Sequence, residues 1–317
     1  MKAVLGFDTS CYTTSVALAD LEGNVLSSSR RLLSVKPGSR GLQQSAALFQ
    51  HITRLPEMVS LLGKAPDVQI CAVSASTRPR PVESSYMPVF RAGESQARTV
   101  AQLLNVPFYP FSHQEGHIRA ALYRSGLPAG EPFLAVHLSG GTTEVVKVSR
   151  EGIRLLFATS DLSAGQLLDR VGVRLGLSFP AGPEMEALAR RLPHPRGIFG
   201  ASLKGEYCSF SGIEAAAMRS IERGTMTPEE LAGELFDAVA RTVARMIGSC
   251  ADESGCRRVL LAGGVASSLL LRDMLEDRRE RYRIDVQLYY ALPEYSGDNA
   301  AGIALLGSDQ LADRSMG

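Results

Sequence analysis

The sequence predicts a two-lobed α/β protein, and three observations support that prediction. An internal repeat opens each half of the chain, strands alternate with amphipathic helices after each copy, and glycine and proline gather at residues 125–132. Alternating strands and helices are typical of a mixed or parallel sheet covered by helices. We therefore expect two similar lobes, residues 1–128 and 129–317, with a cleft between them.

The repeat aligns residues 5–26 with residues 134–155 without a gap. Both segments read as an apolar strand, a small polar turn, a β-branched strand, a Glu-Gly turn and a third strand. Chance similarity between two β-meanders is the alternative, but a duplicated unit explains the matches better. Eight of the 22 positions are identical, and in the first copy these are Leu5, Ser10, Thr13, Thr14, Val16, Glu22, Gly23 and Leu26.

The segments after each copy supply the remaining elements. Residues 43–63 have the spacing of an amphipathic helix, and residues 68–76 read as a buried strand. In the second half, residues 228–254 form a long amphipathic pattern that leads into the apolar strand 257–265. Each lobe is thus expected to continue from its three strands into helices and further strands.

Composition excludes several classes of protein. The 317 residues are 45% hydrophobic and carry a net charge of +1, which lacks a strongly basic footprint but argues neither for nor against nucleic acid. Five scattered cysteines without a Cys-x-x-Cys pair are typical of a reducing compartment. Asp8 interrupts the apolar N-terminus, and no apolar run reaches the ~18 residues of a membrane span. The expected location is the cytoplasm, without a membrane.

Three glycine-rich or hydroxyl-rich turns could hold a phosphate chain. Residues 8–14 and 139–143 each join two strands, and Gly263 and Gly264 lie between a strand and a helix. Glycine allows a ligand to approach the backbone closely, and successive N–H groups bind anions. The chain has neither a G-x-x-x-x-G-K-[ST] loop nor a G-x-G-x-x-G motif. Turns in both halves therefore favour a nucleotide site of another type.

His113 and His117 stand four residues apart at the start of a predicted helix. Side chains at this spacing lie on one face, and two neutral imidazoles make half of a metal site. The alternative is that His113 caps the helix and His117 packs in the core. Glu115 lies at the wrong step for the H-E-x-x-H motif, so a zinc protease of that type is not expected.

With these motifs in place, the chain resembles the TsaD family, long labelled glycoproteases, over essentially its whole length. That family has the fold of actin, hexokinase and the heat-shock ATPases, called ASKHA. The stretches that carry the resemblance are residues 5–18, 112–122, 137–148, 161–183, 208–218, 260–268 and 292–307.

The resemblance implies a set of site residues. His113, His117 and Asp298 would hold one divalent metal ion, iron or zinc. Asp169 and Gly182 would hold a nucleoside sugar. The other residues expected at the nucleotide are Ser10, His137, Leu138, Ser139, Gly140, Gly141, Gly263, Gly264 and Ser268.

It also implies the reaction and its partners. TsaD-like enzymes bind a threonylcarbamoyl adenylate and transfer the acyl group to adenine in certain tRNAs. ATP or an acyl adenylate is thus the expected cofactor. tRNA and either a TsaB-like protein or a second copy of this chain are the expected partners.

Several departures separate the chain from the family pattern. Tyr12 and Thr13, near Asp8 at the expected reaction centre, replace two acidic residues, so the catalytic residue stays open. Thr142 replaces a histidine and Ser268 an asparagine. Residues 76–98 replace a glycine-rich segment and bring arginines that either bind an anion or face solvent: Arg78, Arg80, Arg91 and Arg98.

These departures leave two functions open. The first is transfer of a threonylcarbamoyl or related carbamoyl group from an adenylate to tRNA adenosine or another acceptor. The second is a catalytically weak ATP-binding scaffold that regulates a TsaD-type complex. A protease is not expected, because no nucleophile and base stand in protease spacing.

Overall fold

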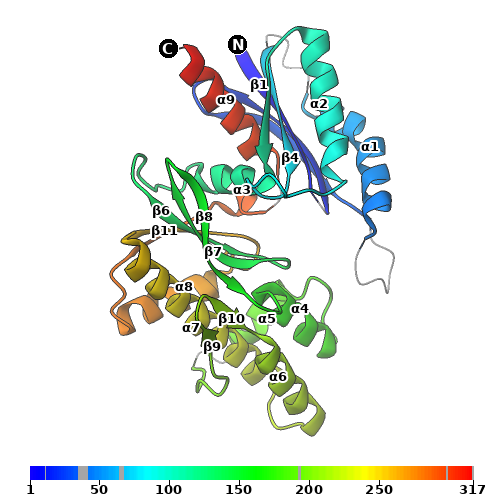
Figure 1. Cartoon of the computed structure of the whole chain (residues 1–317). Coiled ribbons are helices and arrows are strands. Elements are labelled where there is room, and N and C mark those ends of the chain that lie inside the picture. Colours follow the sequence, from blue (N-terminus) through cyan, green and yellow to red (C-terminus); the bar gives the residue numbers. More distant parts are fainter. Residues whose placement is uncertain (11, 35–41, 64–67, 192–193, 298, 316–317) are drawn as a thin grey trace. The chain divides into compact units, whose positions relative to one another are not determined.

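A computed structural model describes residues 1–10, 12–34, 42–63, 68–191, 194–297 and 299–315 (Figure 1). The chain divides into two compact units, Met1–Tyr123 with Asp298–Gly317, and Arg124–Gly297. The first boundary lies close to the expected one at residues 128 and 129. The C-terminal end differs from the expected second lobe, because the last helix packs on the first sheet. Sequence order could not indicate this return of the chain.

The first unit contains a five-stranded sheet in the order β3-β2-β1-β4-β5. β1 pairs antiparallel with β2, and β2 with β3, whereas β1, β4 and β5 run parallel. The carboxyl ends of these three parallel strands therefore lie at one edge of the sheet. The strands are β1 (Lys2–Thr9), β2 (Thr13–Asp20), β3 (Val25–Leu32), β4 (Gln69–Arg78) and β5 (Phe108–Ser112).

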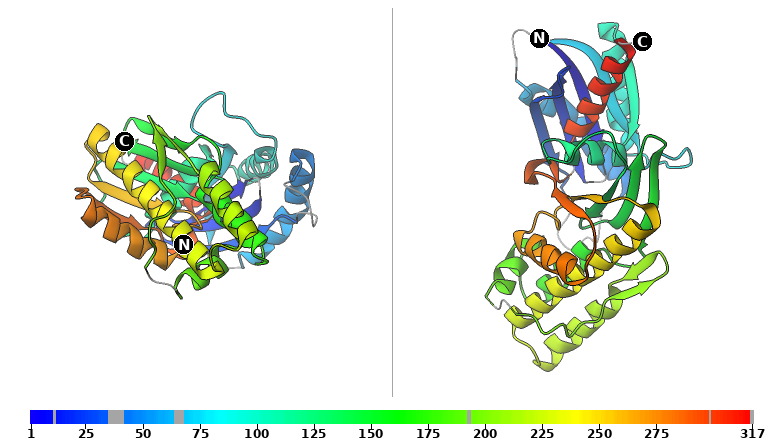
Figure 2. Two further views of the ribbon diagram at one scale, coloured as in Figure 1. Left: turned by 90° about the horizontal axis from the view of Figure 1, so that it is seen from below. Right: turned by 90° about the vertical axis from the view of Figure 1, so that its left-hand side faces the viewer.

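Helices cover both faces of this sheet, as Figures 1 and 2 show. α1 (Gln44–Leu61) and α2 (Phe90–Leu104) lie on one face, and α3 (His113–Leu122) and α9 (Ala301–Ser315) on the other. Side chains along β1 alternate between the two faces of the sheet. Leu5 and Phe7 point to the face of α1, since they belong to the core cluster that contains Leu55 of that helix. Gly6 points the other way, and a Cβ there would lie 2.6 Å from the Ala304 backbone nitrogen of α9.

Glycine also permits the contact between α3 and α9. A Cβ on Gly302 would lie 1.8 Å from the carbonyl oxygen of Gly116, so only glycine fits at this crossing. We expect Gly302→Ala to destabilise the protein by about 1–3 kcal/mol or more, because the two backbones must separate. Gly212→Ala is the matched control, since Gly212 is a helical glycine with open space around its Cβ position. A thermal melt in which both variants behave alike would contradict this account.

The second unit contains a seven-stranded sheet in the order β12-β11-β6-β7-β8-β10-β9. Its first five strands repeat the order of the first sheet, with β6, β7 and β8 in the places of β1, β2 and β3. The sequence repeat is therefore confirmed as a structural repeat. The strands are β6 (Phe133–Leu138), β7 (Thr143–Ser149), β8 (Gly152–Thr159), β9 (Ser202–Lys204), β10 (Tyr207–Ser209), β11 (Arg258–Ala262) and β12 (Gln287–Tyr290).

The helices of the second unit pack around α7 (Pro228–Ser254), whose bounds match the predicted helix. α7 begins at a capping box, in which the Thr227 hydroxyl accepts from Glu230 N and the Glu230 carboxylate accepts from Thr227 N. No helix in the described residues is long and apolar enough to cross a membrane. The other helices are α4 (Ala164–Arg174), α5 (Gly182–Ala189), α6 (Ser211–Arg223), α8 (Leu269–Arg281) and the short 3-10 helix η1 (Pro293–Tyr295).

Candidate functional site

The start of α3 fixes the two histidines at the sheet edge. Ser112 is the N-cap, and its hydroxyl accepts from Glu115 N at 3.2 Å. The Glu115 carboxylate accepts from Ser112 N at 2.7 Å, which completes a capping box. Glu115 thus stabilises the first turn of the helix, and Ser112 rather than His113 is the cap. This contradicts the capping alternative for His113.

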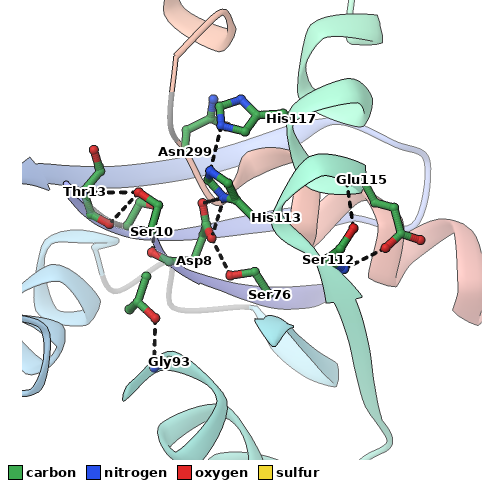
Figure 3. Close-up of polar contacts among 12 residues, drawn as sticks. Asp8, Ser10, Thr13, Ser76, Gly93, Ser112, His113, Glu115, His117 and Asn299 are labelled. Carbon is green, nitrogen blue, oxygen red and sulfur yellow. Dashed lines mark hydrogen bonds and ion pairs between the residues drawn. The ribbon is translucent and has the colours of Figure 1, made fainter. Parts of the chain in front are cut away.

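The Nε2 atoms of the two imidazoles face each other. His113 Nε2 lies 2.9 Å from His117 Nε2, and the ring centroids are 4.3 Å apart (Figure 3). His117 is nearly buried and His113 is partly buried, so solvent reaches the pair from few directions. The sequence prediction that one helical face brings these side chains together is confirmed.

Asp8, from the end of β1, fixes the orientation of His113. Its carboxylate oxygens lie 2.9 and 3.0 Å from His113 Nδ1, and Figure 3 shows the row Asp8, His113, His117. The Ser76 hydroxyl of β4 donates to the same carboxylate, which is almost fully buried. A carboxylate that accepts from Nδ1–H keeps the proton off Nε2 of a neutral imidazole, so that Nε2 can accept a hydrogen bond or ligate a metal. We call Asp8, His113 and His117 the histidine site.

The histidine site has the donor chemistry of a divalent metal centre. Zinc lies about 2.0–2.1 Å from an imidazole nitrogen, so one ion can contact two nitrogens separated by 2.9 Å. The carboxylate behind His113 is the partner that metal-bound histidines usually have. No group of three metal-ligating side chains occurs among the described residues, and Asp298, the third expected ligand, lies outside them. Its neighbour Asn299 stands beside His117 (Figure 3).

His51 supports the adjoining turn, a role that its position in an amphipathic helix did not reveal. Its Nε2 lies 2.8 Å from the Ser10 carbonyl oxygen, and its Nδ1 lies 2.8 Å from the Thr14 hydroxyl. Burial lowers the pKa of His51, although the Ser10 carbonyl and the charge of Asp8 act in the opposite direction. A neutral His51 therefore ties α1 to the turn between β1 and β2.

Within that turn, the two residues that stand where the family resemblance implies acids differ in exposure. Tyr12 is 48% exposed, whereas Thr13 is 3% exposed and its carbonyl oxygen accepts from Ser10 N at 3.2 Å. The Ser10 hydroxyl is buried and bonds inside the turn. Neither Tyr12 nor Thr13 is a carboxylate, so Asp8 is the acid of this segment, and it is engaged with His113.

The equivalent turn of the second unit has the same backbone bond but a more open surface. Ser139 N donates to the Thr142 carbonyl at 2.8 Å, as Ser10 N does to Thr13. Thr143, which corresponds to Thr14, accepts from Ala164 N and so ties the turn to the start of α4. A Cβ on either Gly140 or Gly141 would meet nothing within 4 Å. Both glycines are exposed, although Gly141 N donates to the Ser139 hydroxyl and the Gly140 carbonyl accepts from the Ser163 hydroxyl.

Asp169 and Gly182, the expected sugar-binding pair, are brought together. The Asp169 carboxylate accepts from Ala181 N at 2.8 Å, at the residue before α5 begins with Gly182. Burial raises the pKa of Asp169, and the N–H groups of Ala181 and Gly182 act against that rise. Asp169 is thus half-buried and bonded to the start of α5. A Cβ on Gly182 would meet open space.

The turn after β11 depends on a glycine. Gly263 is required there, because its φ is +103° and a Cβ would lie 2.1 Å from the Leu138 carbonyl oxygen and 2.9 Å from His137 Cδ2. Gly263 and Gly264 lie between β11 and α8 as expected, and a turn separates them from Leu269, where α8 begins. The Ser268 hydroxyl accepts from Leu271 N and caps α8. The second-unit candidates therefore gather around the end of β6 and the starts of α4, α5 and α8.

The comparisons with known proteins agree with this fold and these motifs. A family model named TsaD, described as tRNA N6-adenosine threonylcarbamoyltransferase, matches residues 85–305. A tRNA N6-adenosine threonylcarbamoyltransferase of Thermus thermophilus is 32% identical over 317 residues, which cover 95% of this chain and 91% of that protein. A probable bifunctional tRNA threonylcarbamoyladenosine biosynthesis protein of Methanothermobacter thermautotrophicus is 30% identical over 309 residues. The match covers 96% of this chain but only 55% of that longer relative.

Solved structures support the fold at much lower identity. HypF from T. kodakarensis has a TM-score of 0.62 at 15% identity, with 98% of this chain and 48% of that chain covered. A ROK family glucokinase from Streptomyces griseus, in complex with glucose and AMPPNP, has a TM-score of 0.56 at 15% identity, with 97% and 99% covered. The predicted ASKHA fold is therefore confirmed. Because the family model spans more than half of the chain and the Thermus relative matches nearly all of it, this chain belongs to the TsaD family of tRNA threonylcarbamoyltransferases.

Proposed function

We propose that this protein is a metal-dependent carbamoyl transferase that takes a threonylcarbamoyl or related carbamoyl group from an adenylate. The observation that carries the proposal is the histidine site, where two Nε2 atoms lie 2.9 Å apart and a buried carboxylate holds the far side of His113. Family membership supports the reaction class, and the acceptor is tRNA adenosine or another nucleophile.

In this proposal, His113, His117 and Asp298 would hold iron or zinc. When bound, the metal supplies Lewis-acid polarisation of a carbonyl or carboxylate oxygen of the donor. Asp8 keeps the proton of His113 on Nδ1, and Ser76 and His51 hold Asp8 and the adjoining turn in place. These contacts preorganise the ligands before any substrate arrives.

The transfer forms one bond and breaks another. The acceptor nitrogen attacks the carbamoyl carbon, and the bond between that carbon and the adenylate oxygen breaks, which releases AMP. The acceptor nitrogen must also lose a proton. Tyr12 and Thr13 offer no carboxylate as a base, so we propose that the proton passes to solvent or to a base carried by another molecule.

The adenylate would bind at the second-unit candidates. Gly140 and Gly141 are exposed, and their lack of side chains would let a phosphate approach this turn closely. Asp169 and Gly182 would contact the sugar, and Gly263, Gly264 and Ser268 the adenine or its phosphates. We do not assign Ser10 a direct contact, because its hydroxyl is buried in its own turn.

Gly140→Val tests this part of the proposal. The substitution should leave the fold intact, because Gly140 has open space at its Cβ and no positive φ. It should remove most of the rise in melting temperature that ATP, ADP or AMP causes in the presence of metal. Gly200→Val is a suitable control, since Gly200 is also exposed with open space. The same nucleotide shift in all three proteins would rule out binding at this turn.

The second candidate function is a catalytically weak ATP-binding scaffold in a TsaD-type complex, with a TsaB-like protein or a second copy as partner. The exposed Tyr12 at an acidic family position favours it. A direct assay separates the two. Threonylcarbamoyl adenylate, tRNA and metal are mixed with the protein, and modified adenosine is measured by mass spectrometry. Transfer supports the enzyme, whereas nucleotide binding without transfer to any acceptor supports the scaffold.

A further inference from the structure

The four arginines of residues 76–98 differ sharply in their surroundings. On α2, Arg91 and Arg98 both pair with Glu94, at 2.7 and 3.0 Å. Arg98 also lies over the Phe108 ring, 4.4 Å from its centroid. These two side chains already have partners within their own unit. The structure thus favours the solvent-facing interpretation for Arg91 and Arg98.

Arg78 is different. Its Nε is buried and makes no hydrogen bond within the described part of the chain, and no ion pair joins Arg78 to another described residue. A buried N–H of a charged group without a partner is costly, so such groups normally face a ligand, an ion or water. The residue as a whole is partly exposed.

The position of Arg78 connects it to the histidine site. It is the last residue of β4, two residues after Ser76, whose hydroxyl donates to Asp8. In the parallel ladder it pairs with Ser112, the residue before His113. The next carbonyl, of Pro79, accepts from Gln114 N in the first turn of α3. Arg78 is therefore fixed at the carboxyl ends of parallel strands, where α/β sheets bind ligands.

The start of α3 cannot bind an anion well without this side chain. The first-turn N–H groups of Gln114 and Glu115 are already bonded to the Pro79 carbonyl and the Ser112 hydroxyl. An arginine fork supplies several donors in a plane that matches a carboxylate or a phosphate.

We propose that Arg78 binds an oxyanion, a carboxylate or a phosphate, of the ligand that occupies the histidine site. The identity of that ligand rests on the proposed function. Arg78 then helps to set specificity for an anionic donor, in a segment where the family resemblance implies glycines instead of arginines. Its role is binding and not proton transfer, since a guanidinium stays charged.

The test measures binding of small oxyanions by calorimetry, in buffer without phosphate or carboxylate. N-carbamoyl-L-threonine probes a carboxylate source, and AMP and inorganic phosphate probe a phosphate source. Arg78→Gln should weaken binding of one probe class by about 10- to 100-fold, the usual loss for a hydrogen bond to a charged group. Arg78→Lys should retain part of the affinity. Arg91→Gln is the control, because it removes the same charge while Glu94 keeps its ion pair with Arg98.

Metal content and melting temperature are measured in parallel. If Arg78→Gln loses affinity for one probe class while its metal content and melting temperature stay unchanged, the proposal is supported and the source of the oxyanion is identified. Equal affinity of Arg78→Gln and the unaltered protein, or no binding of any probe by the unaltered protein, would overturn it. A fall in metal content or melting temperature that accounts for the loss would overturn it as well, because Arg78 would then be structural. None of these readouts needs transfer activity, so failure of the proposed function is detected separately.

Discussion

Replacing His117 with alanine should leave the purified protein with far less than about one divalent metal ion per chain. His117 Nε2 and His113 Nε2 face each other at 2.9 Å, so the variant would lose one of two imidazoles that converge on one point. A site with three protein ligands that loses one keeps too few donors to hold a metal through purification. The measurement is elemental analysis of protein prepared without added metal. His194→Ala is the control, because His194 is exposed and lies in the other unit.

Asp8→Asn extends this experiment to the carboxylate behind His113. Loss of such a partner typically weakens metal affinity by about 10- to 100-fold, which is less than loss of a ligand. The amide keeps the shape of the side chain and can still accept from Nδ1–H, so the variant mainly removes charge. Metal content should be highest in the unaltered protein, lower in Asp8→Asn and lowest in His117→Ala. Full metal content in His117→Ala would mean that the histidine site does not hold the metal.

The sequence predicted the duplicated strands, the contact between the two histidines and the long helix, because these features depend on local pattern. The repeat predicted three equivalent strands in each half, and equivalent residues such as Ser10 and Ser139 occupy equivalent turns. The spacing of His113 and His117 on a helix specified that their rings would meet. The long helix 228–254 followed from its apolar period.

Features that depend on distant contacts could not be predicted. Residues 301–315 return to the first sheet because glycine at 302 allows α9 to cross α3, and neither residue indicates the other in sequence. His51 reads as one polar residue of an amphipathic helix, yet it bonds a turn 41 residues away. From the sequence alone, Arg78 and Arg91 could each bind an anion or face solvent. Only their three-dimensional neighbours distinguish Arg91, which pairs with Glu94, from Arg78, whose Nε has no partner among the described residues.

The unaltered protein should transfer little or no threonylcarbamoyl group to tRNA by itself. Tyr12 and Thr13 stand where the family resemblance implies acids, and a missing general base typically costs about 10²–10⁴-fold. The net charge of +1 also lacks the strongly basic balance that favours tRNA phosphates. The assay supplies the adenylate donor, tRNA and metal, and measures modified adenosine by mass spectrometry. Efficient modification without a partner would make this protein an ordinary member of its family.

Restoring a base should be possible at Tyr12 but not at Thr13. Tyr12 is 48% exposed, so Tyr12→Asp places a carboxylate in contact with water at little cost in stability. Thr13 is 3% exposed, and Thr13→Glu would bury a larger, charged side chain inside the turn that His51 supports. Tyr12→Asp should therefore recover part of the transfer, while Thr13→Glu should lower the melting temperature. Tyr12→Asn separates the effect of side-chain shape from the effect of basicity, because asparagine has the shape of aspartate but is not a base. If Tyr12→Asn and Tyr12→Asp have the same rate, the carboxylate is not the missing base, and the family's acidic position acts by binding instead.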